Sequence, residues 1–267
     1  MSLTSAYIDA GGHPLHVLTA GSGPRTLFLF HETPLSAKSF GPAIALLEQD
    51  FRVVAFDTPG YGASAPTPAP PRLEDYAAIL WRGIAAMQTG PFAMAGIHTG
   101  ASLCLEITRA HPDAAIRGLV LSGVPLTDPE KQPALNSTIA ARAGLQDEAT
   151  ILRGWHDRTR RWKNAPVELL IQALADELQV FPRRDWALSA VMAHDVTPAL
   201  DALQVPTLLL NGVHDSLAAA DIAVARRYPK LESRMLPDVG GQLPWSAADL
   251  YVRHLRDFLL PKFASRR

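Results

Sequence analysis

Short apolar runs of β type alternate with longer helical segments along most of this chain, and this alternation constrains the fold more than any other feature. It is typical of a mostly parallel sheet covered by helices. The expected strands, eight in all, are Ala6–Ile8, Leu15–Leu18, Thr26–Phe30, Arg52–Phe56, Phe92–Ala95, Arg117–Leu121, Thr207–Leu210 and Ser233–Leu236. The expected helices are Lys38–Glu48, Leu73–Met87, Ala101–Ala110, Leu217–Arg227 and Ala248–Leu259. The sequence therefore predicts the α/β fold class, with the first two strands forming a hairpin.

The alternation of strand and helix patterns stops between Leu126 and His194, where helical patterns occur without a convincing strand. We therefore expect a core made of residues 1–126 and 195–267, with a helical cap at 127–194 inserted into it. One cap helix is expected to begin near Pro166, because proline suits the first turn of a helix. Its apolar residues share one face at helical spacing and are expected to pack as core; they are Val167, Leu170, Ile171, Leu174 and Leu178.

The composition excludes several classes of function. The chain has 267 residues, 48% hydrophobic and 19% charged, which suits one globular domain rather than a disordered or fibrous chain. Its formal net charge is -1 without a run of like charges, so we expect no nucleic-acid partner. Cys104 is the only cysteine, which excludes intrachain disulfides and thiolate zinc sites and favours the cytoplasm. Neither a signal peptide nor a membrane-spanning run is recognisable, so no membrane association is expected.

Reactive groups of open parallel sheets gather beyond the carboxyl ends of the strands, so the loops that follow the expected strands are the places to look for chemistry. Five such loops carry polar or glycine-rich sequence. They are residues His31–Pro34, Asp57–Ser64, Gly96–Gly100, Asn211–Asp215 and Asp238–Trp245. The sequence predicts one shared crevice lined by these loops.

Three of these loops make the chain resemble the α/β-hydrolase superfamily from its first strand to its last helix. His31–Pro34 is similar to the His-Gly-x-Pro turn of that family, and Asp57–Ser64 matches its Asp-x-Pro-Gly-x-Gly-x-Ser loop. Gly96–Gly100 has the shape of the nucleophile elbow, a sharp strand-to-helix turn. The resemblance implies an eight-stranded, mostly parallel sheet flanked by helices, with an inserted helical cap. It also implies that Asp57 has a structural role, through hydrogen bonds to backbone N–H groups.

The catalytic positions of the family are altered in this chain. His98 stands where the family has its nucleophilic serine, and Gln242 replaces the histidine base. Asp215 falls where the family places its acid, and Glu32 replaces the glycine of the His-Gly-x-Pro turn. A serine mechanism needs a hydroxyl and a base, and glutamine cannot take up a proton. The ordinary mechanism is therefore excluded.

The remaining groups predict a different site. The backbone N–H groups of Thr33 and Thr99 resemble the oxyanion hole of the family. His98 at the apex of the turn is expected to titrate near neutral pH and to act as base or nucleophile, with Asp215 or Glu32 selecting its tautomer. The residues expected to contact substrate are Glu32, Gln242, His31 and Trp155.

Several activities fit this prediction. A base beside an oxyanion hole can hydrolyse an ester, lactone or similar carbonyl compound, directly or through an acyl-imidazole. It can equally abstract a proton in lyase, isomerase or cofactor-free oxygenase chemistry, and a pseudoenzyme would only bind a small molecule. In the cap, a cluster of aromatic and basic residues between Trp155 and Trp162 is either a solvated face or a place where an arginine binds a substrate carboxylate. No cofactor or metal is expected, and the oligomeric state is left open.

Overall fold

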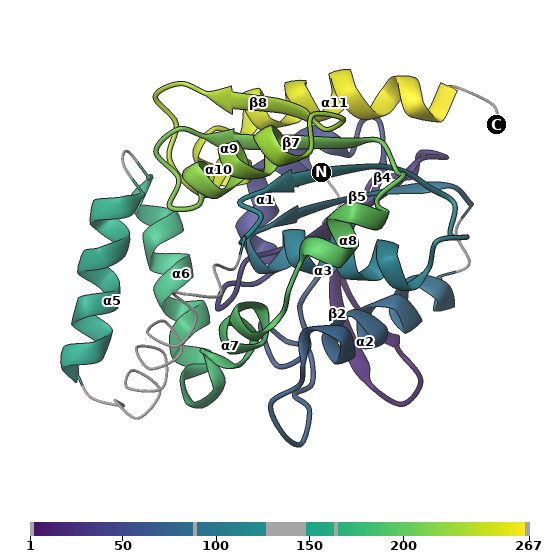
Figure 1. Ribbon diagram of the computed structural model, residues 1–267. Coiled ribbons are helices and arrows are strands. Elements are labelled where there is room, and N and C mark those ends of the chain that lie inside the picture. Colours follow the sequence, from purple (N-terminus) through teal and green to yellow (C-terminus); the bar gives the residue numbers. More distant parts are fainter. Residues whose placement is uncertain (1–2, 88–89, 127–147, 163–164, 265–267) are drawn as a thin grey trace.

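The computed structural model of the chain describes residues 3–87, 90–126, 148–162 and 165–264 (Figure 1). Its centre is one eight-stranded sheet with the order β1-β2-β4-β3-β5-β6-β7-β8. The strands are β1 (Thr4–Asp9), β2 (Pro14–Ala20), β3 (Thr26–Phe30), β4 (Arg52–Phe56), β5 (Phe92–Ile97), β6 (Ile116–Ser122), β7 (Thr207–Gly212) and β8 (Glu232–Leu236). Strand β2 is antiparallel to both of its neighbours, and the pairs from β4 to β8 are all parallel. The predicted eight-stranded, mostly parallel sheet is confirmed.

The burial of the strands explains why the sequence identified them. Every residue of β3, β5 and β7 is buried, because helices cover both faces of the sheet there. Strand β1 lies at the edge, and its residues alternate between exposed and partly buried positions. It forms the predicted hairpin with β2, and Gly11 and Gly12 in the turn both have positive φ angles.

Helices cover the sheet in two layers (Figure 1). One core cluster lies beneath α1 (Gly41–Leu47), α10 (Leu243–Ser246) and α11 (Ala248–Ala264). The other cluster lies beneath α2 (Leu73–Ala86), α3 (Thr99–Ala110), α8 (Thr197–Ala202) and α9 (Ala218–Arg227). The helix expected at Lys38–Glu48 is divided into a 3-10 turn, Ala37–Phe40, and α1, because Pro42 takes the first turn of α1.

Between β6 and β7 the described residues form helices and no strand, as the break in the sequence rhythm predicts. They are α5 (Glu148–Arg161), α6 (Val167–Gln179), the 3-10 turn Phe181–Arg183, α7 (Trp186–Ala193) and then α8. Helices α5 and α6 lie side by side at one end of the sheet (Figure 1). Part of the expected cap, residues 127–147 and 163–164, lies outside the described residues.

The apolar stripe of α6 does not pack as predicted. Val167, Ile171 and Leu178 are 54%, 57% and 45% exposed, whereas the buried positions of the helix are Leu169, Ala173, Asp176 and Glu177. The helix therefore turns part of its charged sequence inward. The reason is that Asp176 and Glu177 find hydrogen-bonding and ionic partners there, which offset part of the usual penalty for burying a carboxylate.

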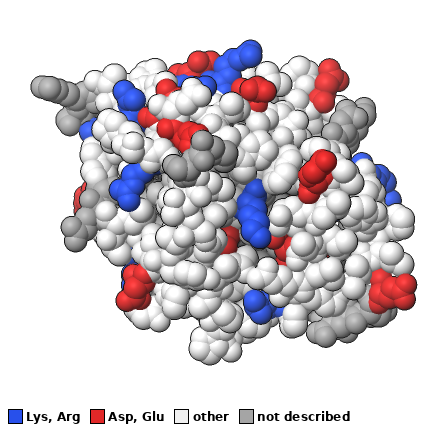
Figure 2. All heavy atoms as spheres, turned by 180° about the vertical axis from the view of Figure 1, so that it is seen from behind, with Lys and Arg blue, Asp and Glu red and all other residues white. Residues whose placement is uncertain are grey.

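The surface is mixed in charge. On the face seen in Figure 2, acidic and basic side chains are interspersed among neutral ones. No helix in the described ranges is long and apolar enough to cross a membrane.

Candidate functional site

His98 occupies a sharp turn between β5, which ends at Ile97, and α3, which begins at Thr99. Its φ of 50° and ψ of -106° lie in a region that non-glycine residues rarely adopt. The turn is possible because a Cβ at Gly96 would lie 2.2 Å from the carbonyl oxygen of Gly100, and only glycine avoids that clash. The strand-to-helix turn predicted at Gly96–Gly100 is confirmed.

The imidazole of His98 lies between two carboxylates. Its Nε2 atom is 3.0 Å from Oδ1 and 3.1 Å from Oδ2 of Asp215, in the loop after β7. Its Nδ1 atom is 2.8 Å from Oε2 of Glu32, in the loop after β3, an ion pair by distance without the alignment of a hydrogen bond. The sheet therefore brings three predicted site residues into contact.

These carboxylates control the protonation of His98. Burial alone would lower the pKa of the imidazole, but Glu32 and Asp215 outweigh it and hold that pKa well above its usual value of 6.5. The two carboxylates therefore favour the imidazolium form of His98, in contrast to the expectation of a side chain that titrates near neutral pH. With both ring nitrogens facing carboxylates, neither offers a lone pair for attack.

Asp215 is held as a carboxylate by further donors. Burial opposes ionisation, but the contact with His98 and hydrogen bonds from the Leu217 N–H, at 2.7 Å, and Asn211 Nδ2, at 3.2 Å, lower its pKa. Asn211 Nδ2 also donates to Asp221, which in turn accepts the N–H of Gly123. Asp221 is not among the site residues predicted from the sequence. Asp221 lies three residues after Ala218 and three before Val224, and all three are buried on α9. This helical spacing is the signal that could have identified it.

Gly123, after β6, provides the space for the His98 ring. A Cβ at this residue would lie 2.2 Å from Cδ2 and 2.7 Å from Nε2 of His98. The φ of Gly123 is also positive, at 71°. The ring therefore requires a glycine opposite it, which the sequence analysis did not identify because the two residues meet only across neighbouring strands.

Thr33 and Thr99 lie beside this site. Their hydroxyl groups are 2.9 Å apart and share a hydrogen bond. Across the described part of the chain, no acceptor is paired with the backbone N–H of either residue. Two unengaged N–H groups, one of them at the start of helix α3, are suited to holding a developing oxyanion.

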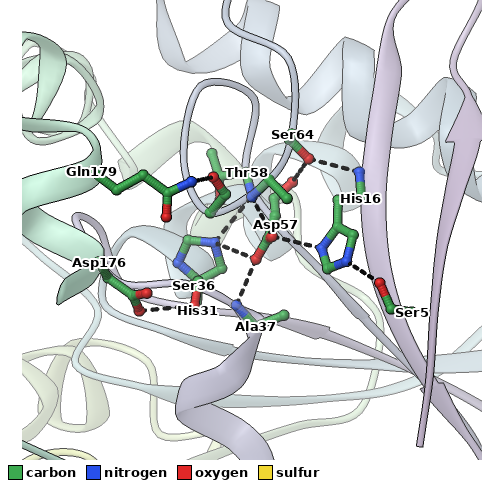
Figure 3. Close-up of polar contacts among 12 residues, drawn as sticks. Ser5, His16, His31, Ser36, Ala37, Asp57, Thr58, Ser64, Asp176 and Gln179 are labelled. Carbon is green, nitrogen blue, oxygen red and sulfur yellow. Dashed lines mark hydrogen bonds and ion pairs between the residues drawn. The ribbon is translucent and has the colours of Figure 1, made fainter. Parts of the chain in front are cut away.

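His31 is part of the loop interior rather than the crevice. Its ring is completely buried, and Nε2 accepts the N–H of Thr58 at 3.0 Å (Figure 3). Nδ1 lies 2.8 Å from the Glu32 carbonyl oxygen. Since Nε2 accepts, Nδ1 carries the proton and donates to Glu32. The position of His31 does not support the predicted contact with substrate. It holds the backbone of Glu32 in place.

Asp57 ties the neighbouring loops together, as predicted (Figure 3). Its carboxylate accepts the N–H groups of Ala37 and Ala63, at 2.7 and 2.8 Å, and lies 2.7 Å from Nδ1 of His16. Burial would raise the pKa of Asp57, but these contacts, with His16 foremost, lower it overall. Asp176 and Gln179 of α6 reach the same loops through Ser36 Oγ and the Gly62 carbonyl. Helix α6 is thereby anchored beside the site.

A cavity of about 210 Å³ opens above His98. Its wall consists of loop residues of the core and of residues in and between α5, α6 and α7, namely Glu32, Thr33, Pro34, His98, Gly154, Asp157, Arg158, Trp162, Glu177, Arg184, Asp185, Leu188, Asp215, Ser216 and Gly241. Four charged residues of this wall between α5 and α7 form ion pairs: Arg158 contacts Glu177 at 2.5 Å, and Arg184 contacts Glu177 at 3.5 Å and Asp185 at 3.1 Å. These ion pairs were not predicted.

Besides His31, two more expected substrate contacts are not on this wall. Trp162 lines the cavity and Trp155 does not. Gln242 is 2% exposed, with both amide atoms buried and unpaired, while its neighbour Gly241 reaches the wall. Among the described residues, no group of three or more His, Cys, Asp and Glu side chains is arranged to hold a metal ion. A larger cleft of about 660 Å³, bordered by α2 and α7, contains none of the predicted site residues.

Comparison with known proteins places this site in a family context. Residues 17–254 match the model of the alpha/beta hydrolase family. The chain is similar to a 2-(acetamidomethylene)succinate hydrolase of Mesorhizobium japonicum, with 24% identity over 96% of this chain and 95% of that protein. It is 25% identical, over 90% of this chain and 88% of the relative, to a protein of Mycobacterium phage D29 named among the non-heme haloperoxidases.

Solved structures share the fold. The enol-lactonase of Burkholderia xenovorans LB400 superposes with a TM-score of 0.79 at 20% identity, over 96% of this chain and all of that one (100%). A malate-bound esterase of Thermogutta terrifontis gives a TM-score of 0.78 at 22% identity, over 98% and 99% of the two chains. At such identities the likeness concerns the fold alone.

Proposed function

Because this chain belongs to the alpha/beta hydrolase family, we propose that it is an enzyme acting on a small carbonyl compound such as an ester or a lactone. One observation carries the proposal. His98 stands at the strained apex of the turn, held between Glu32 and Asp215 and next to the N–H groups of Thr33 and Thr99. A proton-transferring unit and oxyanion donors therefore lie at one cavity, as carbonyl chemistry requires.

The names of similar proteins support this class of reaction. One relative is named a hydrolase of an acetamidomethylene succinate, and two structural neighbours are named an esterase and an enol-lactonase. We place the substrate in the cavity of about 210 Å³, where Arg158 and Trp162 of the cap face the core loops. Residues 127–194 act in this proposal as a cap that shapes the cavity, in a cytoplasmic enzyme that needs no cofactor.

The reaction proceeds without a serine nucleophile. His98 replaces it, and the engaged ring nitrogens and raised pKa of His98 leave a water molecule as the attacking group rather than the imidazole itself. The group formed by His98 and its two carboxylates takes up the proton that the water loses, and the Thr33 and Thr99 N–H groups stabilise the oxyanion. The acyl-imidazole route considered from the sequence is not favoured by this geometry.

A second candidate is proton transfer without hydrolysis, as in a lyase or an isomerase. The observation that favours it is the combination of a charged proton-transfer unit and free oxyanion donors without a hydroxyl or thiol nucleophile at the apex. The same donors that stabilise a tetrahedral oxyanion also stabilise an enolate.

The test is turnover of a panel of activated esters and lactones by the wild type and by His98→Ala. We expect the substitution to lower kcat by about 10²- to 10⁴-fold, the usual contribution of acid–base catalysis. His214→Ala is the matched control, because His214 is an exposed histidine adjacent to Asp215 that does not line the cavity. Absence of turnover by the folded wild type, or equal turnover by His98→Ala, would reject the proposed function.

A further inference from the structure

The other charged residues that line the cavity are paired, Asp157 with Arg160 among them, and the imbalance of charge lies at His98. In the cap, Arg158 and Arg184 are paired with Glu177 and Asp185. His98 instead faces two carboxylates, so its imidazolium leaves one negative charge in excess. Uptake of a proton by one of the two carboxylates would neutralise this excess negative charge. The group of His98, Glu32 and Asp215 is therefore suited to contain a base.

The two carboxylates that flank His98 differ in their surroundings. The Asp215 side chain is only 3% exposed, and its Oδ1 accepts from the Leu217 N–H, from Asn211 and from His98. It has little capacity to accept a further proton, since its hydrogen-bonding partners all favour the charged form. The Asp215 carboxylate is therefore a fixed counter-charge.

Glu32 is the carboxylate that faces the cavity. Its side chain is 12% exposed and lines the cavity wall. Oε2 is buried against His98, and no backbone N–H of the described residues is paired with either oxygen. Oε1, unlike Oε2, is not one of the buried atoms that lack a hydrogen-bond partner, and the side chain lines the cavity, so Oε1 is the oxygen available to a bound molecule.

We propose that Glu32 is the catalytic base of this site, and that His98 and Asp215 are positioning residues that orient it. The inference rests on the proposed function and names the atom that takes the proton, Oε1 of Glu32. His31 contributes by holding the Glu32 carbonyl, which fixes the backbone from which the carboxylate extends. In a serine hydrolase the histidine is the base and a carboxylate orients it. Here the roles are reversed, because the carboxylate of Glu32 is the base and His98 orients it.

The hydrolytic step balances with water as the only co-reactant. Oε1 of Glu32 takes one proton from water while the water oxygen forms a bond to the carbonyl carbon. The π electrons of the carbonyl move to its oxygen, which the Thr33 and Thr99 N–H groups hold. When the oxyanion collapses, the bond to the leaving alkoxide breaks and the alkoxide takes the proton back from Glu32, leaving an acid and an alcohol. His98 keeps its proton throughout.

The pH dependence of the wild type separates Glu32 from His98 as the base. If His98 were the base, it would have to lose its proton first, so kcat/KM would rise only above neutral pH. With Glu32 as the base, kcat/KM is already high at neutral pH and falls when His98 deprotonates at higher pH. We propose to measure this profile from about pH 5 to about pH 9 with the best ester or lactone of the panel.

Substitution of Glu32 provides the second measurement. Glu32→Gln keeps the size of the side chain and is expected to lower kcat by about 10²- to 10⁴-fold with little change in KM, whereas Glu32→Asp, which keeps a carboxylate, recovers part of the loss. Glu168→Gln is the control, because Glu168 is exposed on α6 and does not line the cavity. The folding of each variant is checked by its free energy of unfolding.

Each outcome decides the question. A wild-type profile that rises only above neutral pH, or a folded Glu32→Gln variant with wild-type kcat, would overturn the role of Glu32 while leaving the proposed function intact. If Glu32→Gln fails to fold, the wild-type profile still discriminates, since it needs no variant. Absence of turnover by the wild type on every substrate would overturn the proposed function and the role of Glu32 together.

Discussion

Replacing Gly123 by alanine is the sharpest structural test of the site. The new Cβ would lie 2.2 Å from Cδ2 of His98 and 3.3 Å from Cβ of Leu217. The ring cannot move aside easily, because Asp215 and Glu32 hold its two nitrogens. We expect the left-handed backbone conformation, with a φ of 71°, to cost alanine about 1–2 kcal/mol in the free energy of unfolding. Overpacking adds about 1–3 kcal/mol, so the free energy of unfolding should fall by about 2–5 kcal/mol.

The assay is chemical denaturation of four proteins: the wild type, Gly123→Ala, His98→Ala and the double variant. In the double variant the clash with the ring is absent, and only the backbone cost of about 1–2 kcal/mol remains. The double-mutant cycle should therefore show a coupling of about 1–3 kcal/mol between the two sites. Gly12→Ala is the control for backbone strain, because Gly12 has a φ of 86° with no atom within 4 Å of its added Cβ.

Two results would refute this reasoning. If the effects of Gly123→Ala and His98→Ala are additive, the ring does not rest against Gly123. If Gly123→Ala costs no more than Gly12→Ala, the clash does not exist. Turnover provides an independent check, since displacement of the ring separates His98 from Asp215 and is expected to reduce kcat.

Two further predictions concern stability and reactivity. Asp57→Asn should lower the free energy of unfolding at neutral pH by about 2–4 kcal/mol, because an amide cannot accept all the hydrogen bonds that the carboxylate accepts from Ala37, Ala63 and His16. The pKa of Asp57 is lowered in the folded state, so its contribution is present above about pH 3.9 and is lost as the pH falls through the folded-state pKa. The difference between the two proteins should accordingly shrink in acid, and denaturation curves at several pH values would show a constant difference if this is wrong. Cys104 is buried and burial raises the pKa of its thiol, so iodoacetamide should label it only as fast as the protein opens. Rapid labelling of the native protein, followed by mass spectrometry, would contradict this.

The fold could be predicted from the sequence because it depends on local patterns. Strands β3, β5 and β7 are buried on both faces, so each appears as a continuous apolar run. The turn at His98 could be predicted because Gly96 and Gly100 must lack side chains. Asp57 could be assigned to structure because its loop has a recognisable motif.

The orientation of α6 could not be predicted, since an apolar stripe normally marks the buried face. Here the buried face carries Asp176 and Glu177, and the helix is held by their contacts with Ser36 and Arg158. Ser36 lies far from α6 in the sequence and Arg158 lies on another helix, so the pattern of residues within α6 does not indicate these contacts. For the same reason the sequence alone does not distinguish Trp155, the predicted substrate contact, from Trp162, which lines the cavity.

The sequence by itself determined which chemical groups stand at the carboxyl edge of the sheet, because each loop follows its strand directly. Glu32, His98 and Asp215 stand at this edge, and the positions where the family has its serine and its histidine carry His98 and Gln242. Only the tertiary structure decided that both carboxylates contact His98, at 2.8 and 3.0 Å, and so keep it protonated. The physical reason is that a pKa depends on distances between charges, and these distances are set by the order of β3, β5, β6 and β7 in the sheet.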